Sequence, residues 1–104
     1  MPRKVYKLQI TPEALIEIQE AVYYYNSKRK GLGKEFFREL KQDFVKVKAK
    51  PYNYSVRYDD VRWISMGRFP YAAHFTVTEE GKVIIIQAVL SHHQNPEANW
   101  KKRL

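Results

Sequence analysis

The spacing of the hydrophobic residues changes at Pro51, and this change constrains the fold more than any other feature of the sequence. Before Pro51, apolar side chains recur every three or four residues over two long segments, which is the period of an amphipathic helix. After Pro51, short runs rich in β-branched and aromatic residues are separated by turn residues, which is typical of strands. The sequence therefore predicts a helical part followed by a β-rich part.

The helical part is preceded by a predicted strand at residues 5–10, where apolar and polar residues alternate. Thr11 and Pro12 then provide an N-cap and a first-turn proline for the first helix. Gly31 and Gly33 end this helix, and the second is expected at residues 34–49. The predicted buried stripes are Leu15, Ile18, Val22 and Tyr25 in the first helix, and Phe36, Phe37, Leu40, Phe44 and Val47 in the second. The short connection predicts an antiparallel helical hairpin.

The β-rich part contains four predicted strands, at residues 55–58, 61–66, 71–77 and 82–90. The last of them is apolar on both faces apart from Gln87, which predicts a strand deep in the sheet. Asn95 and Pro96 predict the start of a short C-terminal helix. The fold class is therefore α+β, with an N-terminal strand, an antiparallel helical hairpin, a three- to four-stranded antiparallel meander and a short C-terminal helix. No linker or repeat divides the chain, so residues 1–104 are expected to form a single domain.

The net charge is +8, from 19 Lys and Arg residues against 11 Asp and Glu residues. Such a charge on a small domain attracts polyanions, of which nucleic acid is the commonest, and it suits an acidic protein partner equally well. A third interpretation is that the charge only aids solubility. The charge alone does not choose among these.

Several classes of protein are disfavoured by what the sequence lacks. There is no cysteine, which excludes disulfides, thiolate metal sites and cysteine nucleophiles. The longest apolar run is residues 83–86, far too short to cross a membrane, and no signal-peptide core follows the N-terminal basic residues. We therefore expect a soluble, cytoplasmic protein that makes no membrane contact.

Three groups of residues, in this order along the chain, carry a resemblance to a known family. They are Val61-Arg62-Trp63, then Arg68-Phe69-Pro70-Tyr71 with His74-Phe75-Thr76-Val77, then the aliphatic strand at residues 84–90 followed by His92 and Asn95-Pro96. Together with the Thr11-Pro12 helix start, they resemble the RelE/ParE superfamily of toxins from type II toxin–antitoxin systems, which includes plasmid stabilisation proteins. The resemblance covers almost the whole chain and implies the same α+β fold.

The resemblance implies a toxin that inhibits growth, and it leaves three functions open. The first is metal-independent cleavage of mRNA on the ribosome, which would make the protein an endoribonuclease. The second is non-enzymatic poisoning of DNA gyrase, as in ParE-type toxins, and the third is an inactive toxin-like domain that binds nucleic acid. Each implies no cofactor. The resemblance also implies a cognate acidic antitoxin that folds on the basic, aromatic surface, in a homodimer or a toxin–antitoxin hetero-oligomer.

Candidate catalytic residues are His92, His93, Arg62 and Arg68. A histidine near this end of the chain matches the acid or base of related nucleases, and an arginine binds two phosphate oxygens with its fork. The alternatives are surface-loop histidines and an arginine at position 62 that bridges to a helix carboxylate. The adjacent histidines have no third ligand patterned around them, so no metal site is predicted.

Candidate nucleic-acid-binding residues are Lys46, Lys50 and Arg57, which would form a basic rim over the sheet. The alternative is a solvated, lysine-rich helix end favoured by the helix dipole. One departure from the family pattern concerns Ala72 and Ala73, because many relatives carry an arginine directly after the Phe-Pro-Tyr segment. This departure removes one phosphate ligand, so the choice between ribonuclease and inactive domain stays open.

Overall fold

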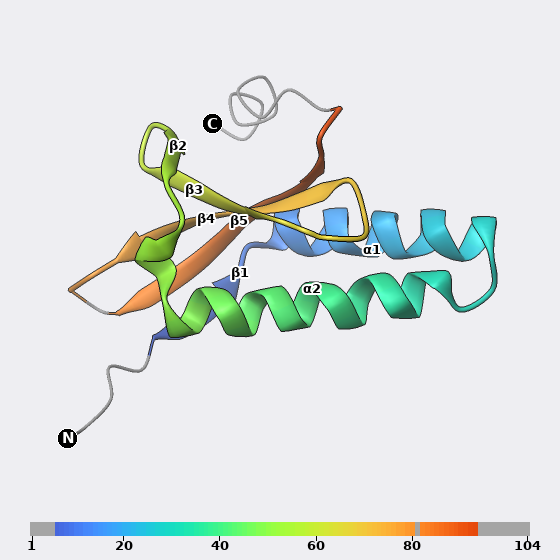
Figure 1. The fold of residues 1–104 in the computed structure, drawn as a ribbon, viewed down its shortest axis with the longest axis horizontal. Coiled ribbons are helices and arrows are strands. Elements are labelled where there is room, and N and C mark those ends of the chain that lie inside the picture. Colours follow the sequence, from blue (N-terminus) through green and yellow to red (C-terminus); the bar gives the residue numbers. More distant parts are fainter. Residues whose placement is uncertain (1–5, 81, 94–104) are drawn as a thin grey trace.

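The computed structural model describes residues 6–80 and 82–93, which form one five-stranded sheet and two long helices (Figure 1). The elements, in chain order, are β1 (Lys7–Ile10), α1 (Pro12–Lys28), α2 (Leu32–Ala49), a short 3-10 helix η1 (Pro51–Asn53), β2 (Val56–Tyr58), β3 (Val61–Ser65), β4 (Tyr71–Thr78) and β5 (Val83–Ser91). The predicted α+β order is confirmed for these elements. The predicted C-terminal helix lies outside the described residues.

The helical hairpin is confirmed, and its ends follow from the residues that cap it. The Thr11 hydroxyl accepts a hydrogen bond from the backbone N–H of Ala14, which satisfies one of the free donors at the start of α1. Gly31, with φ of 87°, turns the chain between the helices, a conformation that favours glycine. The Asn26 side chain then accepts a hydrogen bond from Gly33 N–H at 2.8 Å, so that α2 begins two residues before the predicted start.

The strands lie in the order β1-β5-β4-β3-β2. Strands β2 to β5 pair antiparallel with their neighbours in sequence, which confirms a four-stranded meander. The N-terminal strand β1 pairs parallel with β5, so the sheet is mixed. Parallel pairing requires a crossover connection, and the helical hairpin provides it. Strand β5 consequently lies inside the sheet, in agreement with its apolar sequence.

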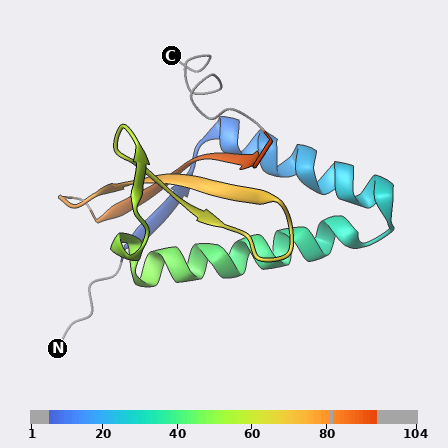
Figure 2. The same ribbon diagram turned by 45° about the horizontal axis from the view of Figure 1, so that its top comes forward.

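The core lies between the sheet and the helices, which both pack on the same face of the sheet (Figure 2). Its largest fully buried side chains include Phe36 and Leu40 of α2, Phe75 of β4, and Ile84 and Ile86 of β5. In β4 every second residue packs in or against this core, as the two-residue period of a strand requires. In β5, Ile84 and Ile86 follow the same period, and Val89 enters the core after a register shift.

Two residues assigned to the buried stripes are in fact exposed, because each faces the outer side of the hairpin. Leu15 is 45% exposed and Phe37 is 39% exposed. In α1 the smaller Ala14 and Ala21 are buried beside Ile18 instead. Small residues allow the helix to approach its neighbours closely, and the larger side chains are left on the outside.

Candidate functional site

The face of the sheet turned away from the helices, here called the far face, carries a cluster of four side chains from three strands. Trp63 on β3 and His74 on β4 are directly opposite each other, with ring centroids 4.8 Å apart. Tyr58 on β2 places its hydroxyl oxygen 2.9 Å from His74 Nδ1. The guanidinium carbon of Arg57 lies 5.0 Å from the centre of the Trp63 ring. We call Arg57, Tyr58, Trp63 and His74 the far-face cluster.

An irregularity in the pairing of β2 with β3 brings these side chains together. Val56 and Tyr58 pair with the consecutive residues Arg62 and Val61, so Arg57 is the extra residue of a bulge in β2. In a regular strand, Arg57 and Tyr58 would point to opposite faces. A β-bulge re-aims a side chain, and such bulges are common beside active sites. Both residues therefore contact the same tryptophan.

The members of the cluster differ in their access to solvent. His74 is 3% exposed, Tyr58 and Trp63 are half-buried, and Arg57 is exposed. A guanidinium over an indole ring gains electrostatic attraction while its N–H groups remain available to an anion. The cluster therefore combines a cation, a flat aromatic surface and a hydroxyl hydrogen-bonded to an imidazole.

Arg62, predicted to bind phosphate, lies on the opposite side of β3 from this cluster. It is paired with Phe75, whose side chain is in the core, and its guanidinium donates a hydrogen bond to the Tyr54 carbonyl oxygen. The same guanidinium lies over the ring of Tyr52 at 5.0 Å. The Tyr52 hydroxyl donates to the Glu79 carboxylate at 2.6 Å, and this hydrogen bond raises the pKa of Tyr52 to about 12. In these contacts Arg62 connects β3 to the segment after α2.

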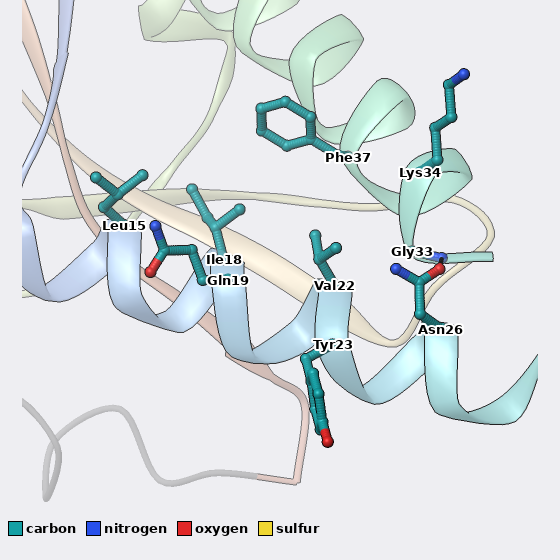
Figure 3. A pocket seen from close by; sticks show the side chains of 9 residues that line it. All are labelled: Leu15, Ile18, Gln19, Val22, Tyr23, Asn26, Gly33, Lys34 and Phe37. Carbon is teal, nitrogen blue, oxygen red and sulfur yellow. Dashed lines mark hydrogen bonds between the residues drawn. The ribbon is translucent and has the colours of Figure 1, made fainter. Parts of the chain in front are cut away.

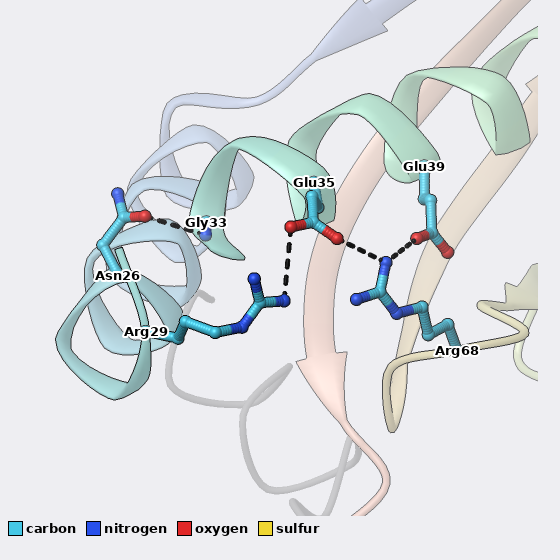
Figure 4. Close-up of polar contacts among 6 residues, drawn as sticks. All are labelled: Asn26, Arg29, Gly33, Glu35, Glu39 and Arg68. Atoms are coloured by element: carbon cyan, nitrogen blue, oxygen red, sulfur yellow. Dashed lines mark hydrogen bonds and ion pairs between the residues drawn. The ribbon is translucent and has the colours of Figure 1, made fainter. Parts of the chain in front are cut away.

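Arg68 lies in the loop after β3 and contacts α2 (Figure 4). Its Nη1 atom is 2.7 Å from a Glu35 oxygen and 3.0 Å from a Glu39 oxygen. Arg29 from the end of α1 also reaches Glu35, at 3.3 Å. Hydrogen bonds from Arg68 lower the pKa of Glu35, and those to Glu35 raise the pKa of Arg68. The structure therefore does not bring Arg62 and Arg68 together on one face of β3. The loop that carries Arg68 is instead held against α2 by these ion pairs.

His92 and His93 follow β5 and are exposed. The backbone N–H of His92 donates to the Pro70 carbonyl oxygen at 2.9 Å, so this histidine lies beside the loop that carries Arg68. The predicted catalytic quartet is thus split between the start of β3 and the region of this loop. The roles assigned to its four members stay predictions.

Lys46 and Lys50 lie at the C-terminal end of α2, and both are exposed. Lys46 Nζ is 3.8 Å from a carboxylate oxygen of Asp43. Burial raises the pKa of Asp43, and the neighbouring Lys46 opposes this shift. Of the three residues predicted to bind nucleic acid, only Arg57 lies in the far-face cluster. The binding roles of Lys46 and Lys50 also stay predictions.

The sequence analysis missed Tyr58, Trp63 and His74 as a group. The signal that could have revealed them is the alternation of β4. The side chains of His74 and Thr76 point to the far face, whereas those of Phe75 and Val77 point to the core. Alternation also locates the two alanines that depart from the family pattern. Ala73 is fully buried in the core and paired with Ile64, so only the position of Ala72 is on the far face.

A second surface feature is a groove of about 490 Å³ between the two helices (Figure 3). Leu15, Val22 and Tyr23 of α1 line it, together with Phe37 and Lys34 of α2. Tyr23 is 78% exposed. In Figures 1 and 2 the tip of the hairpin projects beyond the strands. We call this feature the hairpin groove.

Within residues 6–80 and 82–93, no three His, Asp or Glu side chains gather closely enough to hold a metal ion. Neither α1 nor α2 has the length and apolar character needed to cross a membrane.

Comparison with solved structures identifies the fold. A chain of the chromosomal ParDE toxin–antitoxin system from P. aeruginosa matches with a TM-score of 0.73 and 17% sequence identity, over 86% of this chain and 98% of that one. The fold is RelE/ParE-like. A chain of the intact E. coli RelBE toxin–antitoxin complex matches with a TM-score of 0.67 and 22% identity, over 86% of this chain and 99% of that one. The isolated E. coli RelE toxin matches with a TM-score of 0.66 and 21% identity, over 95% of this chain and 99% of that one.

The match to the RelE/ParE-like fold comes from comparison of structures. No protein-family model matches the sequence, and no curated protein matches it significantly. The likeness therefore supports the arrangement of helices and strands, and the function has to be argued from the residues of this chain.

Proposed function

We propose that this protein is the growth-inhibiting toxin of a type II toxin–antitoxin pair and that it acts in the cytoplasm by metal-independent cleavage of mRNA at the ribosome. The observation that carries the ribonuclease proposal is the far-face cluster. Cleavage at a ribose 2′-hydroxyl needs a proton acceptor, a cation at the phosphate and a surface on which a base stacks. Arg57, Trp63 and the Tyr58–His74 pair supply these chemical types within one contiguous group.

The partner we propose is an acidic antitoxin that binds as an amphipathic helix in the hairpin groove. Two of the matched structures are RelE-type toxins bound to an antitoxin, one the intact complex and one a complex with a RelB peptide. The groove is lined by exposed apolar side chains. In helix-in-groove recognition, an amphipathic helix packs its apolar face against such side chains. Its α2 edge is basic, because Lys34 lines it and Lys41 lies over the Phe37 ring at 4.9 Å. An acidic helix is complementary to this edge, whereas a second copy of a chain with net charge +8 is repelled by it.

Expression of the chain alone, and then with the acidic protein encoded beside it, tests the proposed function. We expect rapid growth arrest with loss of translation and cleaved messages, and rescue on co-expression. Normal growth in cells that accumulate the folded protein would contradict the proposal.

The alternative target is DNA gyrase, bound without catalysis. It is favoured by the higher TM-score of the ParDE chain compared with the RelE chains. The same expression experiment separates the two functions. DNA damage and filamentous cells with intact messages would indicate gyrase and exclude the ribonuclease.

A further inference from the structure

We propose that Tyr58 and His74 form the proton-transfer pair of the ribonuclease, with Arg57 at the scissile phosphate and Trp63 under a base. This inference rests on the proposed function and assigns its chemistry to residues of one site. Tyr58 is the catalytic residue, because it is half-buried and is therefore the member of the pair that can meet the ribose. His74 is a positioning residue that acts through Tyr58, since it is almost fully buried.

The hydrogen bond between the two side chains provides a path for proton movement. The Tyr58 hydroxyl oxygen and His74 Nδ1 are 2.9 Å apart. The phenol donates to Nδ1 in the neutral tautomer that carries its proton on Nε2, and the proposed relay uses this tautomer. In this state the Tyr58 hydroxyl can pass its proton to His74 while the Tyr58 oxygen accepts a proton from the ribose 2′-hydroxyl. The two side chains can therefore act as a short proton relay.

The proposed reaction is a transesterification within RNA. The ribose 2′-hydroxyl gives its proton to the Tyr58 oxygen while the Tyr58 proton moves to His74 Nδ1. The 2′-oxygen then bonds to phosphorus and the bond from phosphorus to the 5′-oxygen breaks. The leaving 5′-oxygen takes a proton from water. His74 then returns its proton to the Tyr58 oxygen as the Tyr58 hydroxyl proton passes to the resulting hydroxide. The products are a 2′,3′-cyclic phosphate and a 5′-hydroxyl, and no metal or other co-reactant is required.

Arg57 and Trp63 are placed for the two remaining tasks. Arg57 precedes Tyr58 in sequence, and the register shift in β2 places it on the face that carries the Tyr58 hydroxyl. Its fork can bind the phosphate oxygens on which negative charge develops. Trp63 contacts Arg57, Tyr58 and His74, so a base stacked on it would lie directly beside the relay.

The pairing pattern independently marks this part of the sheet. In β2, Val56 and Tyr58 pair with the consecutive residues Arg62 and Val61, so Arg57 is an extra residue directly beside Tyr58. A bulge gives up regular ladder hydrogen bonds and re-aims a side chain, and this one turns Arg57 and Tyr58 toward the same tryptophan.

The test is cleavage of an mRNA in a purified translation system by wild type and by Tyr58→Phe and His74→Gln. Phenylalanine preserves the ring and removes the hydroxyl, and glutamine still accepts a hydrogen bond but cannot take the proton. At saturating toxin we expect each variant to cleave at least about 10²-fold more slowly, with unchanged half-saturation, because general acid–base catalysis contributes on that scale. Wild type should leave 2′,3′-cyclic phosphate ends.

The matched control is Tyr52→Phe, which removes the hydroxyl of another tyrosine whose partner is Glu79. It should cleave at the wild-type rate. If wild type cleaves and folded Tyr58→Phe cleaves equally fast, the proton-transfer pair is wrong while the ribonuclease stands. Full activity of His74→Gln would overturn the relay, and if that variant does not fold, Tyr58→Phe decides alone. Absence of cleavage by wild type would instead overturn the proposed function.

Discussion

The two faces of the sheet differ in what their side chains contact. On the helix side, Phe75 and Ile84 pack with Phe36 and Leu40 of α2 in a continuous apolar core. On the far face, the neighbouring position His74 contacts an indole and a phenol instead. Because adjacent residues of a strand point to opposite faces, one strand supplies both the core and the candidate site.

This difference separates stability from chemistry. Burial of large apolar side chains is the main favourable term in folding, and the helix side contains most of it. The far-face cluster holds polar groups whose partners come from three strands, so its geometry depends on the sheet that the helix side stabilises. Substitutions on the two faces should therefore have separable effects.

Phe36→Ala should give the largest loss of stability on the helix side. Phe36 is 0% exposed and contacts the rings of Tyr25, Phe69 and Tyr71. We expect the free energy of unfolding to fall by about 3–5 kcal/mol, as for buried Phe→Ala substitutions. Urea unfolding measures it. The matched control is Phe37→Ala at the next residue, which should cost well under half as much because that ring faces the hairpin groove. Equal losses would contradict the assignment of the core.

Trp63→Leu should weaken RNA binding more than it lowers the stability of the fold. Loss of a stacking surface weakens binding by about 1–3 kcal/mol per base, so the half-saturation for mRNA cleavage should rise. The cleavage rate at saturation should change less than in Tyr58→Phe. Val56→Ala, an exposed substitution on β2, serves as the control. A variant that binds and cleaves like wild type would exclude Trp63 from the site.

Phe37→Ala should weaken binding of the antitoxin while leaving the toxicity of the free protein intact. Removal of an apolar anchor from an interface typically costs more than about 1 kcal/mol of binding free energy when the residue is a hot spot. Titration calorimetry with the proposed acidic antitoxin measures the change. Val45→Ala is the control, since Val45 is exposed on the same helix but is not among the residues that line the groove. Unchanged affinity would place the antitoxin elsewhere.

Arg68→Gln should give a small loss of stability that depends on pH. Arg68 holds the pKa of Glu35 below its ordinary value of 4.5 in the folded protein. A depressed folded pKa contributes stability that is present above the ordinary value and is lost as pH falls through the folded value. The difference between wild type and variant in urea midpoint should therefore be largest near neutral pH and shrink in acid. A difference that is constant with pH, or grows in acid, would contradict this pairing.

Much of the fold could be predicted because local sequence patterns determine its helices and strands. Helix period, Thr11, Pro12 and Gly31 determine the hairpin, and β-branched runs determine the meander. Leu15 was assigned to the core because spacing alone does not say which apolar stripe faces the sheet. The parallel pairing of β1 with β5 joins residues far apart in sequence, and no local signal specifies it.

The candidate site could be predicted only in part, for the same reason. Arg57 was expected to bind nucleic acid from its charge. Tyr58, Trp63 and His74 become neighbours only when β2, β3 and β4 are aligned in register and the bulge in β2 is included. A shift of one residue would turn His74 toward the core. Sequence alone gives residue types, whereas this cluster depends on register.

We propose that the helix side folds the protein and that the far face performs its chemistry. The most direct test is the mRNA cleavage rate of Tyr58→Phe, measured on the same preparation as its unfolding curve. We predict a variant that unfolds cooperatively as a folded protein and cleaves at least about 10²-fold more slowly than wild type. A folded variant that cleaves at the wild-type rate would contradict the claim.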